Sequence, residues 1–371
     1  MKAVVVTGVN EYAVEEIELL PPQVAELRVK MKATGLCMSD HHVISGAFPT
    51  SLPCVIGHEG AGVVTEVGPG VTRFAVGDPV ILNFSPSCGK CDMCESGLGL
   101  YCSAWPKEFK LAGRQRDGTC RHQRPGGETI GAFMGLGCMA EYTTIHEDCA
   151  VKVDGSVDLT RACVVSCGVM TGAGAVINTG GVRPGDAVAV FGCGGVGLNA
   201  VQGARIGGAT QIFAVDLSDY KLELAQTLGA TRVINSSQED PVEKIVELTG
   251  GVGADLAVEC VGAPALIRQA YDSTRKLGKT VVAGMAPPDQ DIALNAFDLL
   301  ATGKCLCGHK ASGAHSGQFI GSLIRHYQAG KLDLDTLVSR TYRIDDVQQA
   351  VDDLLSNVNA RGVIVFDQGD A

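Results

Sequence analysis

The sequence predicts an α/β protein with a doubly wound parallel sheet and a second region of antiparallel strands. From Gly185 onward, short apolar runs alternate with helical patterns, as in strands joined by crossover helices. Before about residue 150, alternating apolar and polar segments are instead separated by turn residues, which is typical of antiparallel sheets. The length of 371 residues also favours two domains over one.

The stretch Asp186–Asp216 has the strongest local pattern. The apolar run Ala187–Phe191 leads into the turn Gly192-Cys193-Gly194-Gly195-Val196-Gly197, then a helical run, then a strand that ends at Asp216. Glycines in such a turn let a pyrophosphate lie against bare backbone at a helix N-terminus. An acid at the end of the second strand accepts the ribose hydroxyls of NAD and repels the 2′-phosphate of NADP. The stretch therefore predicts an NAD site, and a Rossmann-like domain without nucleotide is the alternative.

The remaining elements follow from the same patterns. Antiparallel strands are predicted at Lys2–Thr7, Ala13–Glu18, Ala25–Ala33, Gly62–Val67, Pro79–Leu82 and Ala140–Ile145, and a long loop at Trp105–Gly137. Further parallel strands are predicted at Ile212–Val215, Arg232–Ile234, Leu256–Cys260, Thr280–Ala283 and Lys304–Gly308, with helices at Gly195–Ile206, Asp219–Leu228, Val242–Leu248 and Leu266–Thr274. We expect the tail to return to the first domain, with helices at Gly317–Ala329 and Asp345–Leu355 and a strand at Gly362–Phe366.

Composition excludes several classes of partner. A net charge of −11 argues against nucleic acid and anionic membranes. The uncharged runs Ala162–Val182 and Ala187–Ala204 are interrupted by glycine or polar residues and do not resemble lipid-facing helices. The N-terminal run is too short for a signal peptide, so we expect a reducing compartment, the cytoplasm, with the fifteen cysteines as thiols or metal ligands.

Four of these cysteines form a compact group. Cys88, Cys91, Cys94 and Cys102 have the spacing C-x2-C-x2-C-x7-C, and four thiolates this close in sequence can surround a tetrahedral ion. Ferredoxin motifs begin with the same spacing but place the fourth cysteine three residues on, before a proline. The pattern therefore predicts structural zinc, with an iron–sulfur or redox-active dithiol cluster as the alternative.

Cys37, His58 and Cys167 are candidates for a second metal site. They are far apart in sequence, and each lies beside glycine-rich, turn-prone residues that can present a side chain to a cleft. Two thiolates and an imidazole with an open fourth position are a known catalytic zinc set.

With these motifs the chain resembles the zinc-dependent medium-chain alcohol dehydrogenases of the longer type, which carry a second, structural zinc. The resemblance rests on Gly35–Asp40, Gly57–Gly62, the four-cysteine lobe, Cys167–Gly172, and Gly192–Gly197 with Asp216. It implies a GroES-like catalytic domain at 1–168 and 312–371 with the zinc lobe at about 86–103, and a Rossmann NAD domain at 169–311. It also implies two zinc ions per chain and a homodimer or homotetramer.

The resemblance also implies roles for single residues around the metal. Cys37, His58 and Cys167 would hold the catalytic zinc, which acts on the alcohol as a Lewis acid. Asp40 would orient His58 through its second ring nitrogen, and Glu59 would lie behind the metal.

Other residues would handle the proton and the coenzyme. Ser39 would take the alcohol proton and relay it through the nicotinamide ribose to His42. Thr171 would pack against the nicotinamide, Lys221 would reach the adenosine ribose, and Arg361 would contact the pyrophosphate. The alternatives are a helix cap for Ser39, a surface histidine for His42 and an exposed helix charge for Lys221.

One position departs from the family. Met38 stands where many relatives have Arg or His to contact the cofactor phosphates. Its lack of charge predicts weaker NAD binding and faster release, which can raise kcat where release limits turnover. The alternative is retention of NAD(H) by other contacts, as in the nicotinoprotein branch.

The expected activity is reversible, NAD-dependent oxidation of primary or secondary alcohols. Phe133, Met134, Met139 and Leu300 are candidates for an apolar substrate pocket. A thiol-adduct formaldehyde dehydrogenase is the second interpretation, since class III relatives share the long loop and a string like Asp117-Gly118-Thr119. A zinc- and NAD-binding protein with a structural or sensing role is the third.

Overall fold

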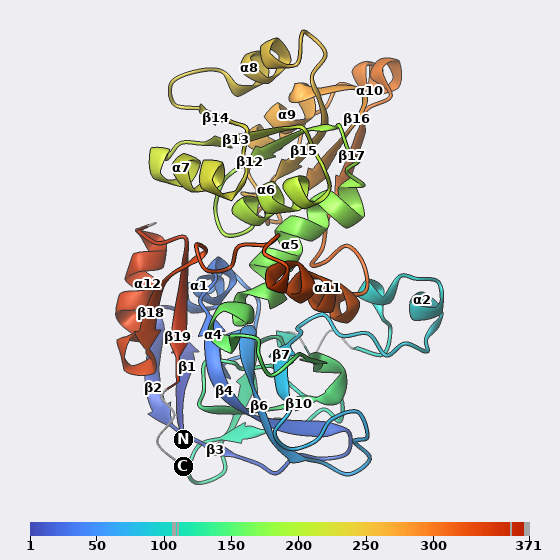
Figure 1. The fold of residues 1–371 in the computed structure, drawn as a ribbon. Coiled ribbons are helices and arrows are strands. Elements are labelled where there is room, and N and C mark those ends of the chain that lie inside the picture. The colour runs from blue at the N-terminus through green and yellow to red at the C-terminus, as the bar shows by residue number, and fades with distance from the viewer. Residues whose placement is uncertain (106–108, 110, 357, 367–371) are drawn as a thin grey trace. The chain divides into compact units, whose positions relative to one another are not determined.

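The computed structural model describes residues 1–105, 109, 111–356 and 358–366, and its internal contacts divide the chain into two units. The first unit contains residues 1–167, 315–329 and 334–371, and the second contains 168–314 and 330–333. Figure 1 shows the elements of both units along the chain. The first unit is therefore built from segments at both ends of the sequence.

The first unit contains two sheets. One has the order β2-β1-β5-β9-β8-β3, formed by β1 (Lys2–Gly8), β2 (Glu11–Glu16), β3 (Glu18–Leu19), β5 (Cys54–Val55), β8 (His122–Gln123) and β9 (Thr129–Ala132). The other has the order β11-β7-β6-β4-β19-β18, with β10 also paired to β4. Its strands are β4 (Glu26–Gly35), β6 (Glu59–Val67), β7 (Pro79–Leu82), β10 (Tyr142–His146), β11 (Ala150–Lys152), β18 (Val338–Arg343) and β19 (Arg361–Val365).

Burial along β4 explains why this strand lies at the centre of its sheet. Leu27, Val29, Met31 and Ala33 alternate along it and are buried in the core of the first unit. The last strand, β19, pairs antiparallel with β4, so that Ile364 lies opposite Thr34. This register brings the beginning of β19 next to the residues that precede Cys37.

Short helices join these strands. Within the described residues, its α-helices with assigned bounds are α1 (Met38–Ile44), α2 (Asp92–Glu95), α4 (Leu159–Ala162), α11 (Ser316–Gln328) and α12 (Val347–Leu355). The 3-10 turns are η1 (Gly99–Tyr101), η2 (Phe133–Gly135), η3 (Glu147–Cys149), η4 (Cys163–Ser166) and η6 (Ile344–Asp346). In Figure 1, α12 lies beside β18 and β19, which it also contacts.

The prediction of a single long loop over Trp105–Gly137 is wrong for part of that segment. Strands β8 and β9 and the turn η2 lie within it, whereas residues 106–108 and 110 fall outside the described residues. Both strands are short, and β9 is held by parallel pairing to β5 more than seventy residues earlier, as in Cys54 opposite Gly131. The residues within such a short strand do not indicate that it pairs with a strand so distant in the sequence.

The second unit has one six-stranded parallel sheet with the order β14-β13-β12-β15-β16-β17. Its strands are β12 (Ala187–Phe191), β13 (Gln211–Asp216), β14 (Arg232–Asn235), β15 (Ala254–Glu259), β16 (Thr274–Val282) and β17 (Cys305–Gly308). Its helices are α5 (Gly168–Gly174), the π-helix η5 (Ala175–Gly180), α6 (Gly197–Ile206), α7 (Asp219–Leu228), α8 (Pro241–Leu248), α9 (Pro264–Ser273) and α10 (Ala296–Thr302). The doubly wound parallel sheet is confirmed.

The helices of this sheet cover both faces. In Figure 1, α6 and α7 lie on one side of the strands and α8 and α9 on the other. Two of the helices have clear capping signals, since the Ser218 hydroxyl accepts from the first turn of α7 and Asp240 from the first turn of α8. Strand β12 is buried along its whole length, as expected for a strand covered on both faces.

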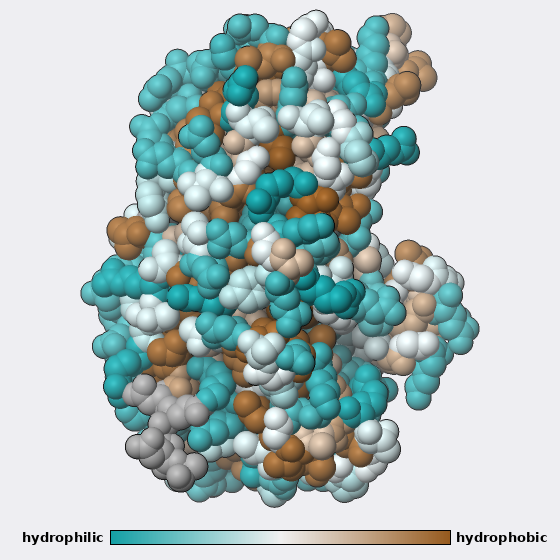
Figure 2. Space-filling model, in the orientation of Figure 1, coloured by the Kyte–Doolittle hydropathy of each residue, from teal (hydrophilic) through white to brown (hydrophobic). Residues whose placement is uncertain are grey.

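Most of the surface in view is hydrophilic, with apolar side chains scattered among the polar ones (Figure 2). Among the described residues, no single helix has both the length and the apolar character needed to cross a membrane. Within this described part of the chain, the bent pair Leu159–Ser166 and Gly168–Gly180 passes that test only when its two helices are taken together.

Candidate active site and coenzyme site

The candidate metal site of the first unit begins at the N-terminus of α1. The backbone N–H of Cys37 donates to Oδ2 of Asp40 at 3.0 Å. The other oxygen of Asp40 accepts from the N–H of Gly57 at 3.0 Å and lies 3.1 Å from Nδ1 of His58. One buried carboxylate thus fixes the backbone beside two of the predicted ligands.

The three predicted ligands converge. The ligand atoms of Cys37, His58 and Cys167, with a carboxylate oxygen of Glu59, all lie within 4.8 Å of one another. Nε2 of His58 is 3.3 Å from Sγ of Cys167. Two thiolates and an imidazole around a tetrahedral zinc ion lie about 3.3 to 3.8 Å apart, so this donor set and spacing fit zinc.

Electrostatics at this site favour a cation. A hydrogen bond from Cys167 lowers the pKa of Cys37 well below its ordinary value, and the nearby Arg361 and His58 lower it further against the effect of burial. The same hydrogen bond, together with burial, raises the pKa of Cys167. Burial lowers the pKa of His58, but the charge and hydrogen bond of Asp40 outweigh it and leave the pKa raised. The negative charge of Asp40 and Cys37, which raises the pKa of His58, also favours a divalent ion bound by these ligands.

Glu59 and Arg361 form a buried ion pair beside the three predicted ligands. The guanidinium of Arg361 bonds to Oε1 of Glu59 across 302 positions in the sequence. Burial raises the pKa of Glu59 to about 7, although the charge of Arg361 acts in the opposite direction. Gly35 leaves room for this carboxylate, because a Cβ at that position would collide with Oε2 of Glu59. The structure thus places Arg361, predicted to contact the pyrophosphate, against Glu59, and its exposed fraction is 8%.

Aromatic rings surround His58. The rings of Phe84 and Phe133 meet its imidazole edge-on, with centroids 5.7 and 5.3 Å away, and Phe48 packs edge-on against Phe133 at 5.4 Å. Phe48 and Phe84 were not among the predicted pocket residues. No motif marks them, and only the hydrophobic character of their segments could have suggested them.

Among the other predicted pocket residues, Met139 packs against Gly57, the residue before His58. Met139 is fully buried in the core of the first unit, and Met134 is partly buried with a positive φ of 54°. Leu300 belongs to α10 of the second unit and is 79% exposed.

Ser39 and His42 both lie on α1. Oγ of Ser39 is 3.8 Å from Sγ of Cys37. The N-cap of the helix is Cys37, so the alternative that Ser39 caps α1 is wrong. His42 is partly exposed in the last turn of α1, and Met38 at its first position is 42% exposed.

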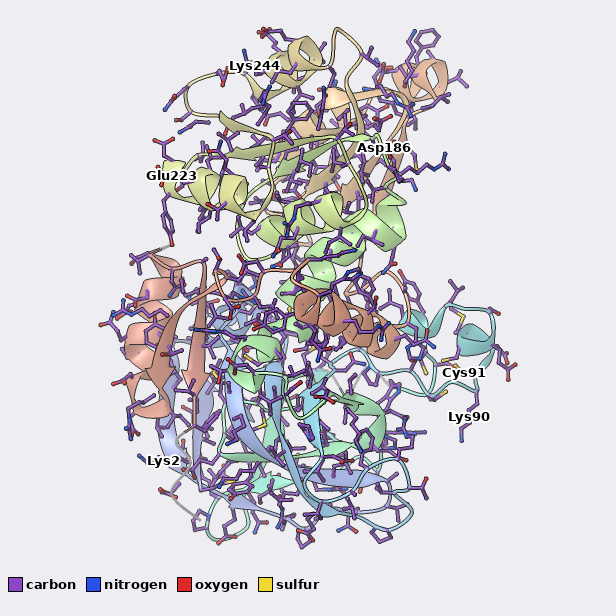
Figure 3. All side chains as sticks on the ribbon, in the orientation of Figure 1. Lys2, Lys90, Cys91, Asp186, Glu223 and Lys244 are labelled. Carbon is purple, nitrogen blue, oxygen red and sulfur yellow. The ribbon has the colours of Figure 1, made fainter. Side chains whose placement is uncertain are left out.

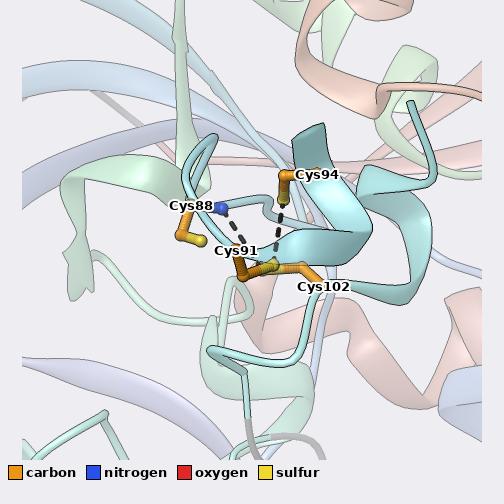
Figure 4. A group of neighbouring side chains, drawn as sticks. All are labelled: Cys88, Cys91, Cys94 and Cys102. Atoms are coloured by element: carbon orange, nitrogen blue, oxygen red, sulfur yellow. Dashed lines mark hydrogen bonds between the residues drawn. The ribbon is translucent and has the colours of Figure 1, made fainter. Parts of the chain in front are cut away.

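The four-cysteine lobe forms a second compact donor set (Figure 4). The sulfur atoms of Cys88, Cys91, Cys94 and Cys102 lie within 4.8 Å of one another. Cys91 Sγ is 3.5 Å from that of Cys94 and 3.7 Å from that of Cys102. These spacings fit a tetrahedral zinc site with four thiolate ligands.

The glycine turn of the second unit has the shape of a dinucleotide cradle. Gly192 has φ +88°, and a Cβ on Gly197 would collide with the carbonyl oxygen of Gly192. Around Gly194 a Cβ would meet no atom within 4 Å, so the backbone there is open to a ligand. Asp216, at the end of β13, accepts from the N–H groups of Cys193 at 2.7 Å and Ser218 at 3.0 Å. The acid is thereby held beside the turn, as an NAD site requires.

Lys221 and Thr171 lie on other elements of the second unit. Lys221 is in the first turn of α7, and its backbone N–H donates to the hydroxyl of Ser218. Thr171 is partly exposed on α5.

Known proteins share this architecture over nearly the whole chain. Residues 23–155 match the alcohol dehydrogenase GroES-like domain, and residues 195–325 match the zinc-binding dehydrogenase family. Alcohol dehydrogenase B of Mycobacterium tuberculosis is 39% identical over 97% of this chain and 96% of its own length. The chain belongs to the zinc-dependent alcohol dehydrogenase family.

Relatives within this alcohol dehydrogenase family differ in named activity. An S-(hydroxymethyl)glutathione dehydrogenase of Saccharomyces cerevisiae is 36% identical over 96% of this chain and 93% of its own length. The crystal structure of benzyl alcohol dehydrogenase from Acinetobacter calcoaceticus superposes with a TM-score of 0.92 at 35% identity, covering 99% of both chains. The family identifies zinc and NAD as the cofactors of this dehydrogenase. It does not identify which alcohol is the substrate.

Proposed function

We propose that this alcohol dehydrogenase oxidises primary alcohols with an apolar, preferably aromatic, substituent and reduces the corresponding aldehydes, with NAD as coenzyme. The convergence of Cys37, His58 and Cys167 carries the proposal. Residues 1–168 and 312–371 would form the catalytic domain and residues 169–311 the coenzyme domain, a division that the two contact units support.

The protein residues would prepare the alcohol for loss of a hydride from carbon and a proton from oxygen. Cys37, His58 and Cys167 would hold a zinc ion, which supplies Lewis-acid polarisation of the alcohol oxygen. Asp40 keeps the Nδ1 edge of His58 engaged, so that Nε2 points toward the ligand set. Ser39 would accept the hydroxyl proton, and His42, at the other end of the same helix, would release it to solvent.

In the second unit, Asp216 would accept hydrogen bonds from the ribose hydroxyls of NAD, and Lys221 would contact the same ribose. The turn Gly192–Gly197 would lie against the pyrophosphate. Thr171 would contact the nicotinamide. Arg361 remains our candidate for a pyrophosphate ligand only if it exchanges its bond with Glu59 for one with the coenzyme.

The aromatic preference rests on the surroundings of His58. Phe84 and Phe133 present ring edges to the imidazole, and Phe48 continues the aromatic group. Ring–ring contacts contribute about 0.5 to 1.5 kcal/mol beyond area burial, enough for about tenfold preference. The named substrate of the Acinetobacter calcoaceticus relative is consistent with this choice.

S-(hydroxymethyl)glutathione is the second candidate substrate, because relatives from yeast and Paracoccus denitrificans carry that name. The Asp117-Gly118-Thr119 string offers it little support. Thr119 donates to Asp117 through its N–H at 2.9 Å and its hydroxyl at 2.7 Å, and Arg121 pairs with the other oxygen at 2.6 Å. Asp117 and Thr119 thus form a local turn, and Arg121 is also engaged by the buried carboxylate of Glu26.

We also propose a homodimer or homotetramer in the cytoplasm. Strand β17 is an edge strand of the six-stranded sheet, and Leu277, Phe297 and Leu300 of the same unit are exposed apolar side chains. An edge strand near exposed apolar side chains favours association. All fifteen cysteines lie within the described residues and none forms a disulfide there, which is consistent with a reducing compartment.

A substrate panel tests the activity. Zinc-replete protein is incubated with NAD and benzyl alcohol, cinnamyl alcohol, ethanol, 2-propanol, or formaldehyde with glutathione, and absorbance at 340 nm is followed. We expect kcat/KM for benzyl alcohol to exceed that for ethanol by at least about tenfold. The Phe84→Ala variant should lower the ratio of kcat/KM for benzyl alcohol to kcat/KM for ethanol, because one aromatic ring near His58 is lost. Turnover of the glutathione adduct alone would replace the proposal with the second candidate, and no turnover with any substrate would favour a non-catalytic role.

A further inference from the structure

One histidine joins the four-cysteine lobe to a helix from the other end of the chain. His315 is the N-cap of α11, and its Nδ1 accepts from the backbone N–H of Gln318 at 3.3 Å. Because Nδ1 is an acceptor in this bond, the neutral ring carries its proton on Nε2. That nitrogen lies 2.8 Å from Oγ of Ser87, so it donates to the hydroxyl of the residue before Cys88. The imidazole thus links the start of α11 to the start of the lobe.

A second part of the lobe packs against the same contact. A Cβ on Gly99 would lie 3.1 Å from Cβ of Ser87 and 3.6 Å from Cδ2 of His315, so the glycine lies against both residues. The carbonyl oxygen of Gly99 accepts from the N–H of Cys102 at 3.1 Å. Ser87 is covalently joined to Cys88. Both lobe residues that meet the imidazole are therefore attached directly to predicted zinc ligands.

His315 stands where the chain returns from the second unit. Residues 168–314 belong to the second unit, whereas 315–329, which contain α11, belong to the first. In the first unit α11 contacts η4, whose last residue directly precedes Cys167. The first turn of α11 therefore begins a segment that packs against the turn before a candidate catalytic ligand.

We propose that zinc in the four-cysteine lobe fixes the first turn of α11 through His315, a positioning residue between the metal lobe and the helix. The inference rests on zinc as the ion of the lobe. Residues 88–102 contain only the short helices α2 and η1, so the places of Ser87 and Gly99 depend on the bound ion. Loss of the ion would release the Nε2 edge of the imidazole. By linkage, the bond that holds the helix strengthens zinc binding by the same factor.

Zinc affinity tests the coupling from the side of the lobe. Ser87→Ala removes the hydroxyl and leaves the cap of α11 intact. His315→Asn keeps a side-chain oxygen that can cap the helix, but it is too short to reach Ser87. We expect each variant to bind the lobe zinc about fivefold more weakly, the factor expected for one lost hydrogen bond. The double variant should lose no more, because both changes remove the same bond.

The measurement is competition with a chromophoric chelator on the zinc-replete protein, and the lobe ion is the one missing from Cys94→Ala. Ser51→Ala, an exposed serine in the same unit, is the matched control. Hydrogen exchange gives the reverse measurement. In Cys94→Ala the amides of Gln318 and Phe319, which both bond to His315, should exchange about fivefold faster, while those of α12 stay unchanged.

The outcomes separate coupling from general loosening. Unchanged zinc affinity in both single variants, losses that add in the double variant, or unchanged exchange at the start of α11 would each overturn the proposal. If His315→Asn does not fold, Ser87→Ala alone must show weaker zinc binding and faster exchange in the first turn of α11. If the lobe of the unmodified protein holds no zinc, the lobe assignment itself fails, a result distinct from failure of His315 alone.

Discussion

Asp40 lies 3.1 Å from Nδ1 of His58, while the opposite nitrogen of that ring lies 3.3 Å from Sγ of Cys167. The imidazole is thus held on one edge by a carboxylate and offers the other edge to the ligand set. The same carboxylate accepts from the N–H groups of Cys37 and Gly57, so it couples two ligands to one anchor.

Asp40→Asn should weaken zinc binding at this site about 10- to 100-fold, because the amide lacks the charge that favours the cation. Competition with a chromophoric chelator, with the zinc site of the four-cysteine lobe as internal reference, measures the loss. Asp289→Asn, an exposed change in the second unit, should have no effect. Equal zinc retention in both variants would remove Asp40 from this role.

Cys167→Ser should lower the zinc content from two ions per chain to one and abolish alcohol oxidation, while the fold persists. Serine is a much poorer zinc ligand than a thiolate. Metal analysis and turnover are measured together. Cys163→Ser is the control, since this buried cysteine bonds to the carbonyl oxygen of Thr160 and lies outside the ligand set. Activity retained in Cys167→Ser would refute the ligand assignment.

Cys94→Ala should remove the zinc of the lobe and lower Tm, since residues 88–102 contain only the short helices α2 and η1 to hold them together. Differential scanning calorimetry measures the change. The exposed thiol of Cys305 provides the control variant Cys305→Ala. An unchanged Tm after loss of one zinc ion would contradict a structural role for the lobe metal.

Asp216→Gly should relax the preference for NAD over NADP, because the repulsion of a 2′-phosphate disappears with the carboxylate. The ratio of kcat/KM for the two coenzymes should fall by at least about tenfold. Glu223→Gln on α7 (Figure 3), an exposed acid in the same unit, should leave the ratio unchanged. The assignment of Asp216 to the ribose is wrong if both variants retain the original preference.

His122 should make the protein sensitive to mild acid. Burial lowers its pKa to about 4 in the folded chain, whereas an unfolded histidine titrates near 6.5. Protonation therefore favours the unfolded state, and stability falls as pH drops from 6.5 toward 4. The expected loss is about 2 kcal/mol between pH 7.5 and 5. Urea unfolding at both pH values should show a smaller difference for His122→Gln; equal differences would exclude this histidine as the cause.

Local patterns predicted the second unit best. Strand β12 and helix α7 have the predicted bounds, because an apolar run before a glycine turn, and a serine cap followed by Gly229, are local signals. Strands β8 and β9 are short, and their outer partners β3 and β5 are distant in the sequence, so both were missed. The partner of Arg361 was also missed, since no local rule connects it to Glu59. The family resemblance predicted that Cys37, His58 and Cys167 share one site. It did not predict that the rings of Phe48 and Phe84 belong to the aromatic group around His58.

Strand β19 has a consequence for how the protein is made. All three candidate zinc ligands of the first unit are synthesised by residue 167, yet the strand that carries Arg361 leaves the ribosome nearly two hundred residues later. During translation, the entire parallel sheet is therefore synthesised before the Arg361 guanidinium becomes available to pair with the Glu59 carboxylate. In a nascent chain arrested before β19, the end of β4 that pairs with β19 would be exposed, and Glu59 would lack Arg361. Because exposed strand edges promote aggregation, we expect chaperones to bind that intermediate.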